Sequence, residues 1–161
     1  MIKLIDKKNF IAYKKIRLEA LLNFPNSFLS TYQQEFDLTD QEWVNKINNN
    51  MIFGYFIDNQ IVGIIGLNLE KNHKIKHTAT LFGMYLNPAY QGKNIATELL
   101  NHVKKIAKNH RVSQIYLGCN AENIRAVNFY KKSGFKIYAT KPNYIKINDK
   151  FCDDLMMMVE V

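Results

Sequence analysis

Residues 84–96 read Met84-Tyr85-Leu86-Asn87-Pro88-Ala89-Tyr90-Gln91-Gly92-Lys93-Asn94-Ile95-Ala96, and this stretch decides the fold of the 161-residue chain. Its apolar start predicts the end of a strand, its polar middle a loop, and Ile95 the first turn of a helix. The first N–H groups of a helix lack internal partners and, with the helix dipole, attract anions. Gly92 lets backbone approach a phosphate closely, and Lys93 adds positive charge. The stretch is therefore either a pyrophosphate site or an ordinary strand–loop–helix joint.

Upstream of this stretch, the apolar pattern predicts a strand, two helices and three further strands. Apolar residues from Phe10 to Leu21 recur at the period of a helix. The sequence Thr39-Asp40-Gln41-Glu42 is a capping-box pattern that opens the next helix, and a loop is expected between the two. The expected strands cover residues 2–5, 51–57, 61–67 and 77–86, of which the second and third form a hairpin.

Downstream, helices and strands alternate. The expected elements are a helix over 95–108, a strand over 114–119, a helix over 123–132, and strands over 135–138 and 150–161. A strand–helix–strand unit of this kind predicts a right-handed crossover. The whole order predicts a mixed α/β (α+β) fold around one largely central sheet, in a single domain over residues 1–161.

The deciding stretch resembles the signature motif of the GNAT acetyltransferases, in which a strand ending near a proline precedes Gln/Arg-x-x-Gly-x-Gly/Ala at the head of a helix. Gln91 and Ala96 match this motif, and Asn94 replaces the middle glycine. Because asparagine tolerates left-handed backbone better than most residues, the loop is expected to keep its shape. A second stretch, Asn123-x-x-Ala126-x-x-x-Tyr130-x-x-x-Gly134-Phe135, is similar to the second cofactor motif of the family.

The resemblance implies the GNAT fold, a mostly antiparallel sheet splayed at a cofactor cleft and flanked by helices, with acetyl-CoA as co-substrate. It places the CoA diphosphate on Gln91, Gly92, Lys93, Asn94, Ile95 and Ala96. It places the pantetheine arm along Met84, Tyr85 and Leu86, where a bulge leaves backbone groups unpaired, and against Asn123 and Ala126 across the cleft. Tyr130 matches the acid that protonates the departing thiolate and would also contact the cofactor. A tyrosine packed in the core is the other interpretation of that residue.

The sequence identifies no general base. His77 has a suitable intrinsic pKa, but a lone histidine near the start of a strand is more often a surface residue. Glu70 and Glu122 are further candidates. Some members of the family carry a glutamate on the strand before the second motif, where this chain has Gly118. A water relay, or an amine that arrives neutral, is therefore expected.

Composition limits the partners. A net charge of +8 fits a nucleic-acid surface, a lysine-rich solvated surface or a site for an anionic cofactor. The basic residues are spread out, so no nucleic-acid partner is expected. No apolar run is long enough to span a bilayer and no signal-peptide pattern is present, so the expected location is the cytoplasm, with no membrane partner. Cys119 is expected to be a core residue, and no metal-ligand spacing links the histidines to the cysteines, so no metal is expected.

The acceptor is expected to be an amine of a small molecule or peptide. The region from Phe24 to Trp43 would shape its pocket, with Phe28, Tyr32 and Phe36 as wall candidates, and Asp153 and Asp154 would attract a cationic amine or cap a strand end. Many members of the family pair through their last strands, which suggests a homodimer. Two alternatives stay open: a domain of this family that binds CoA without catalysis, and a basic nucleic-acid binder.

Overall fold

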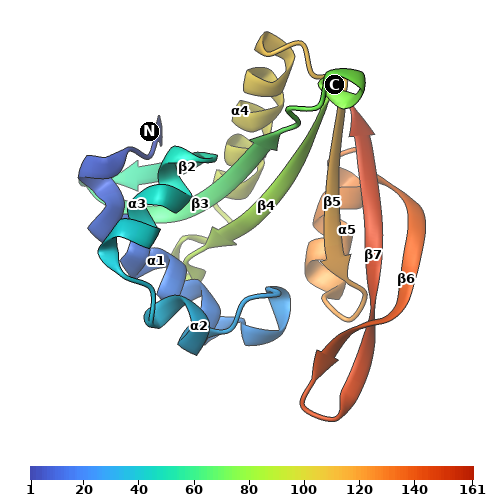
Figure 1. The fold of residues 1–161 in the computed structure, drawn as a ribbon, viewed down its shortest axis with the longest axis horizontal. Coiled ribbons are helices and arrows are strands. Elements are labelled where there is room, and N and C mark those ends of the chain that lie inside the picture. Colours follow the sequence, from blue (N-terminus) through green and yellow to red (C-terminus); the bar gives the residue numbers. More distant parts are fainter.

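A computed structural model describes all residues from Met1 to Val161 and contains one seven-stranded sheet in the order β1-β2-β3-β4-β5-β7-β6. Neighbouring strands are antiparallel except β4 and β5, which are parallel (Figure 1). The strands are β1 (Ile2–Leu4), β2 (Met51–Ile57), β3 (Gln60–Leu69), β4 (Thr78–Leu86), β5 (Gln114–Asn120), β6 (Lys136–Ile147) and β7 (Lys150–Glu160). The predicted mixed α/β class with a mostly antiparallel sheet is confirmed.

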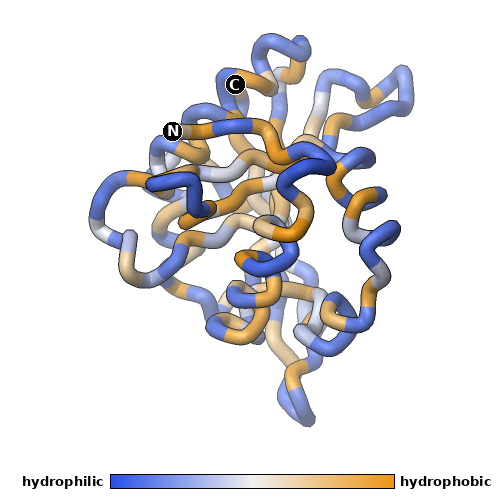
Figure 2. The backbone as a smooth tube through the Cα atoms, turned by 90° about the vertical axis from the view of Figure 1, so that its left-hand side faces the viewer, coloured by the Kyte–Doolittle hydropathy of each residue, from blue (hydrophilic) through white to orange (hydrophobic).

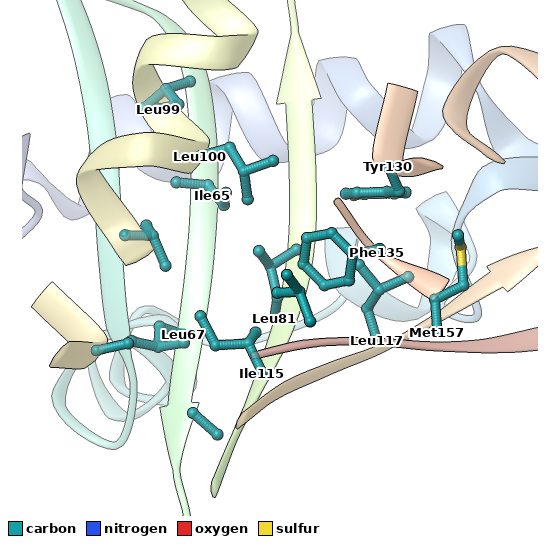
Figure 3. Packing of buried hydrophobic residues seen from close by; sticks show 14 of the residues in the cluster. Ile65, Leu67, Leu81, Leu99, Leu100, Ile115, Leu117, Tyr130, Phe135 and Met157 are labelled. Atoms are coloured by element: carbon teal, nitrogen blue, oxygen red, sulfur yellow. The ribbon is translucent and has the colours of Figure 1, made fainter. Parts of the chain in front are cut away.

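Helices cover both faces of the sheet. On one face, Ile16 of α1 (Phe10–Asn23) and Trp43 of α3 (Asp40–Asn48) pack with Ile52 and Ile64 of the sheet. On the other face, α4 (Ile95–Asn109) and α5 (Ile124–Lys132) contribute to the larger core cluster, part of which Figure 3 shows. The apolar residues of α4 recur at helical spacing, so the helix buries one side and leaves the other to solvent.

The hydropathy of the chain follows this layering. Figure 2 shows orange, apolar stretches along the central strands and blue, polar stretches in the outer loops. Leu67, Leu99 and Ile115 are completely buried between the sheet and α4. Burial of such side chains stabilises the fold by about 1.5–3 kcal/mol each before conformational entropy is counted.

Two elements differ from the expectations. The segment expected as a loop contains a short helix, α2 (Tyr32–Phe36), whose capping box joins Thr31 and Gln34. Five residues are too few to show a helical period, so only the cap signals this helix. Strand β6 continues past Tyr138 to Ile147. Its residues are mostly exposed because it is an edge strand, and Pro142 lies where its register with β7 shifts, so it lacks the apolar alternation of a core strand.

The sheet opens between β4 and β5. Gly66 pairs with Phe82 and Ile64 with Tyr85, so the two β4 residues Gly83 and Met84 lie opposite a single residue of β3. This is the bulge that the family resemblance implied, and Gly83 adopts a left-handed φ of 62° there. Strands β4 and β5 pair only over Thr78–Thr80 and Gln114–Tyr116 and then diverge (Figure 1). The second half of β4 therefore has no strand partner on the side of β5.

Candidate active site

A cleft of about 200 Å³ lies between the unpaired half of β4 and helix α5. The expected residues that line it are Met84, Tyr85, Leu86, Gln91, Ala96, Asn123, Ala126 and Tyr130. Its other lining residues are Phe24, Ser27, Phe28, Arg125 and Phe129. Strand β4 and helix α5 thus bring the two sequence motifs together, although their residues are far apart in the chain. Gly92, Lys93, Asn94 and Ile95 lie outside the cleft lining, in the loop and helix start next to it.

The loop before α4 has the conformation that the sequence predicts for Asn94. Gly92 and Asn94 have left-handed φ values of 77° and 62°. No side chain caps α4, so its first N–H groups have no partner within the helix. A Cβ atom on Gly92 would meet nothing within 4 Å, so the loop borders open space. Free donors at a helix start that borders open space fit the diphosphate of CoA, and Lys93 in the same loop adds a positive charge.

Gln91 connects this loop to both walls of the cleft. Its Nε2 donates to the Leu86 carbonyl oxygen at 3.4 Å, and its Oε1 accepts from Arg125 Nη1 at 2.7 Å. Sequence reasoning did not single out Arg125, which is the exposed residue two positions after the motif asparagine. The side chain of Ile95 is buried in the core, so only its backbone can contact a ligand.

Asn123 caps α5 and connects it to the turn after α1. Its Oδ1 accepts from the Ala126 N–H at 3.1 Å, and its Nδ2 donates to Ser27 Oγ at 3.0 Å. The cap fixes where α5 begins, and the second bond joins it to the turn after α1. Both polar ends of Asn123 therefore have partners within the chain, while the residue still lines the cleft.

Tyr130 has a ring packed in the core and a hydroxyl that borders the cleft. Its ring packs between Phe129 and Phe135, with centroid distances of 5.4 and 5.5 Å, and Figure 3 shows it among the core residues. The residue is only 8% exposed, yet its hydroxyl reaches the cleft and donates to Met84 Sδ at 3.6 Å. Burial raises the pKa of the Tyr130 phenol, so the hydroxyl keeps its proton at neutral pH. The site thus holds a protonated donor close to the strand that carries the bulge.

The Tyr85 hydroxyl points towards α1. Its hydroxyl donates to Glu19 Oε1 at 2.8 Å and accepts from Asn23 Nδ2 at 3.0 Å. Burial and the neighbouring carboxylate raise the pKa of Tyr85 to about 12. These contacts fix β4 against α1, so Tyr85 can serve the cleft only through its backbone.

The base candidates named from the sequence lie outside the cleft. His77 is exposed at the end where β4 and β5 are still paired, and Glu122 forms a surface ion pair with Lys150 at 2.6 Å. Glu70 is not among the residues that line the cleft either. Cys119 is buried, and burial raises the pKa of its thiol to about 11, which makes it a core residue and a poor nucleophile.

A second cavity of about 340 Å³ lies where β4 and β5 diverge and shares Ser27 and Phe28 with the cleft. Of the three aromatic wall candidates, only Phe28 borders it. Tyr32 and Phe36 stack on each other at 5.4 Å and border neither of these two spaces. Asp154 lines the second cavity, whereas Asp153 accepts a hydrogen bond from the Asn143 N–H.

No group of three or more His, Cys, Asp or Glu side chains is arranged to bind a metal ion. None of the helices combines the length and the apolar character that a membrane crossing requires.

Sequence comparisons find a family match and related proteins. The family model described as the acetyltransferase (GNAT) family matches residues 16–135. An L-amino acid N-acetyltransferase from Escherichia coli is 28% identical over 102 residues, which cover 63% of this chain and 62% of that protein. The N-alpha-acetyltransferase 50 of Danio rerio is 43% identical over 58 residues, or 35% of this chain and 34% of the relative. The chain thus matches less than two thirds of the length of these curated relatives.

Solved structures share the fold over nearly the whole chain. A GNAT-family acetyltransferase from Streptococcus pneumoniae superposes with a TM-score of 0.86 at 20% identity, covering 100% of this chain and 99% of that one. The yncA protein of Salmonella typhimurium, solved with its cofactor acetyl-CoA, gives a TM-score of 0.84 at 16% identity, covering 99% and 92%.

Proposed function

Because the chain belongs to the acetyltransferase (GNAT) family, we propose that it transfers the acetyl group of acetyl-CoA to an amine of a small molecule, peptide or protein. The family is one of acetyltransferases that use acetyl-CoA as co-substrate. The observation that supports the proposal most is the Tyr130 hydroxyl, which reaches into a cleft against a bulged strand whose facing edge is unpaired. The amine would attack directly, in a ternary complex.

In this proposal the chain holds its co-substrate mainly through backbone. The free N–H groups at the start of α4 and the Gly92–Asn94 loop bind the diphosphate, with the Lys93 ammonium nearby. The unpaired edge of β4 from Met84 to Leu86 hydrogen-bonds the amides of the pantetheine arm as an added strand would. Asn123 and Ala126 form the opposite wall.

The chemistry needs few side chains. The bound co-substrate supplies a thioester, whose carbonyl carbon accepts the nitrogen while its bond to sulfur breaks. Tyr130 donates its proton to the leaving sulfur, and a backbone N–H near Leu86 stabilises the negative charge that develops on the carbonyl oxygen. The amine must lose a proton first, because a lysine-like amine with a pKa of about 10.4 is mostly charged at neutral pH.

Turnover tests the proposal. The purified chain is mixed with acetyl-CoA and a panel of amines, and thiol release is followed. We expect release that depends on both an amine and the protein. Tight CoA binding without release with any amine would favour the alternative, a CoA-binding domain without catalysis. The left-handed conformation of Asn94 removes one reason for that alternative, because the substituted loop keeps a shape suited to anions.

The proposal also covers the domain organisation, the compartment and the oligomeric state. Residues 1–161 would act as a single domain in the cytoplasm, and two copies would pair through their last strands. Sedimentation equilibrium of the purified chain checks the dimer, and a monomer at micromolar concentration would contradict it.

A further inference from the structure

Arg17 is the most unusual side chain of the second cavity. It is 8% exposed, and its Nε and Nη2 donate to the Glu35 carboxylate at 3.1 and 2.8 Å. Its guanidinium carbon lies 4.6 Å from the centre of the Phe28 ring. Its remaining nitrogen, Nη1, is buried and has no hydrogen-bond partner. An unsatisfied buried donor is costly, so a position that keeps one is a candidate for ligand binding.

The ion pairs around Arg17 leave an excess of positive charge, which would attract an anion. Glu35 also pairs with Lys46, whose Nζ lies 2.9 Å from Glu35 Oε2, so one carboxylate serves two cations. Nη1 faces the β4 bulge, where a Cβ atom on Gly83 would lie 3.8 Å from it. The free nitrogen is therefore next to the bulge that opens the cofactor cleft, in a cavity that Arg17 itself lines.

Asp154 provides the opposite charge in the same cavity. It is 6% exposed, burial raises the pKa of its carboxyl, and the ammonium of Lys141 on β6 partly opposes that effect. Its Oδ2 would lie 2.7 Å from a Cβ atom on Gly118. The carboxylate of β7 thus occupies the space that a side chain at position 118 would enter. Besides Lys141, the charged or titratable groups near it are Arg17 across the cavity and the Cys119 thiol on β5.

We propose that this cavity binds the acceptor as a zwitterion, an α-amino acid with an apolar side chain, whose carboxylate pairs with Arg17 Nη1 and whose ammonium contacts Asp154. The inference rests on the proposed acetyl transfer and names its substrate class. A cavity of about 340 Å³ has room for one amino acid, and Phe28, Phe82 and Ile145 provide apolar surface for its side chain.

In this proposal Asp154 also acts as the general base, which the sequence does not identify. Its carboxylate takes one proton from the ammonium and releases it to solvent through the cavity. The neutral nitrogen then forms its bond to the carbonyl carbon, and the bond from that carbon to sulfur breaks. The sulfur leaves with the Tyr130 proton, and the second proton lost by the nitrogen restores Tyr130 through solvent. The products are an N-acetyl amino acid, CoA with a protonated thiol, and one free proton.

Matched acceptors test the carboxylate contact. L-Phenylalanine is compared with phenethylamine, which lacks only the carboxylate, and with L-phenylalaninamide; L-leucine is compared with isoamylamine. We expect kcat/KM to be about 10-fold or more higher for an amino acid than for its carboxylate-free partner, since hydrogen bonds to charged groups are among the strong ones. Calorimetry in the presence of CoA should show the same order of affinity. Equal or better use of both carboxylate-free amines would overturn the inference.

Two variants test whether Arg17 causes the preference for acceptors with a carboxylate. In Arg17→Gln the ratio of kcat/KM for L-phenylalanine to kcat/KM for phenethylamine should fall towards unity, because the contact with the carboxylate is lost. Lys46→Gln is the matched control, because it removes the other cation on Glu35 without touching the lining of this cavity. A preference that survives Arg17→Gln contradicts the assignment.

Asp154→Asn tests the amine contact even if the Arg17 variant does not fold. The variant should lose about 100-fold or more in kcat/KM at neutral pH, and the deficit should shrink at high pH, where the amine loses its proton unaided. An unchanged pH profile would refute the role. Acetylation of all amines without regard to a carboxylate defeats this inference alone, whereas no thiol release with any amine and no heat from CoA defeats the proposed function.

Discussion

Tyr130 combines a packed ring with an available hydroxyl. Phe129 and Phe135 hold its ring edge to face, so the hydroxyl has little freedom and points at Met84 across the cleft. A rigid donor needs no reorganisation when charge develops on a leaving group. Because burial raises the pKa of the phenol, the proton is present at any physiological pH.

Tyr130→Phe should therefore separate chemistry from binding. It removes one oxygen and leaves the packed ring, so we expect kcat to fall by about 10²–10⁴-fold while the calorimetric Kd for CoA changes little. Tyr116→Phe is a suitable control, since its hydroxyl bonds to Gln114 away from the cleft. A Tyr130→Phe variant with full kcat would show that the residue is only a core tyrosine.

Asp154 should lower the stability of the fold at neutral pH. Burial raises the pKa of its carboxyl, so the folded state holds the proton more tightly than the unfolded state. The stabilisation from this proton is complete below the unfolded-state pKa of about 3.9 and is lost as pH rises through the folded value. Asp154→Asn should thus melt at a higher temperature than the unmodified chain at pH 7, with the gap closing near pH 3.

The exposed Asp149 offers the comparison for that experiment. Asp149→Asn should change stability by no more than about 0.5 kcal/mol, because the side chain is fully exposed beside Lys146. Equal melting temperatures for Asp154→Asn and the unmodified chain across this pH range would show that burial of the carboxylate costs nothing. Higher stability with lower activity would be the usual trade-off at a functional site.

At the scale of elements, the loop that leads into α4 depends on backbone conformation more than on side chains. Asn94 is left-handed and makes no capping bond, so its contribution is the conformation itself. Asn94→Gly should keep the affinity for CoA, because glycine adopts this φ freely. Asn94→Val should weaken CoA binding by about 10-fold, since left-handed backbone costs a β-branched residue about 1–2 kcal/mol.

Calorimetric titration with CoA checks both variants. Gly92→Ala tests the same requirement for left-handed backbone two residues earlier in the loop. A Cβ atom at that position meets no neighbour, so any loss would come from its φ of 77° and not from a clash. Equal affinities for all three variants would show that the diphosphate does not depend on this loop.

The joint between α1 and α2 depends on one buried carboxylate. Burial opposes ionisation of Glu35, but hydrogen bonds and charge from Arg17 and Lys46 outweigh it and lower the pKa of the carboxyl. Glu35→Ala leaves both cations without their shared partner and should cost about 3–5 kcal/mol of unfolding free energy at pH 7. The stabilisation from a lowered pKa is complete above the unfolded-state value and is lost as pH falls through the folded-state value. The loss of unfolding free energy in Glu35→Ala should therefore become smaller below about pH 4.

Chemical denaturation of Glu35→Ala measures this loss. Asp40→Ala, which removes only the exposed partner of Lys14 at 3.4 Å, should cost less than about 1 kcal/mol. Similar losses for both variants would mean that the buried cluster adds no more than a surface pair.

Whether an element can be predicted from the sequence depends on its length and on the regularity of its apolar pattern. Helix α4 was predictable because a long amphipathic pattern repeats, and the αL conformation of Asn94 because few residues tolerate it. Helix α2 and the second half of β6 were missed because one is too short and the other too exposed to show a period. Arg17 and Asp154 share a cavity only through the three-dimensional packing of α1 against the opening of the sheet, which no local pattern encodes.

For the molecule as a whole, the opening between β4 and β5 borders two adjoining spaces. The cleft and the second cavity share Ser27 and Phe28, and the bulge residues Gly83 and Met84 line one space each. In the proposed function, ligands in the two spaces would therefore meet at the bulge. Strands β4 and β5 pair over only three residues each and then diverge, while β3 pairs with the other edge of β4 and β7 with the other edge of β5. In the proposed function, this arrangement would allow direct transfer between two bound substrates.

Of the three explanations of the net charge of +8, two predict a ligand, and the two ligands differ. If the charge serves the CoA diphosphate, CoA at 100 times its Kd should stabilise the folded chain by about 2.7 kcal/mol, which raises the melting temperature by roughly 5–10 °C. The shift should shrink in Asn94→Val and persist in Tyr130→Phe. Short duplex DNA or RNA should give no shift at physiological salt. A rise with nucleic acid that disappears as salt increases, together with none for CoA, would instead identify the basic surface as a phosphate-backbone binder, because such binding weakens steeply with salt.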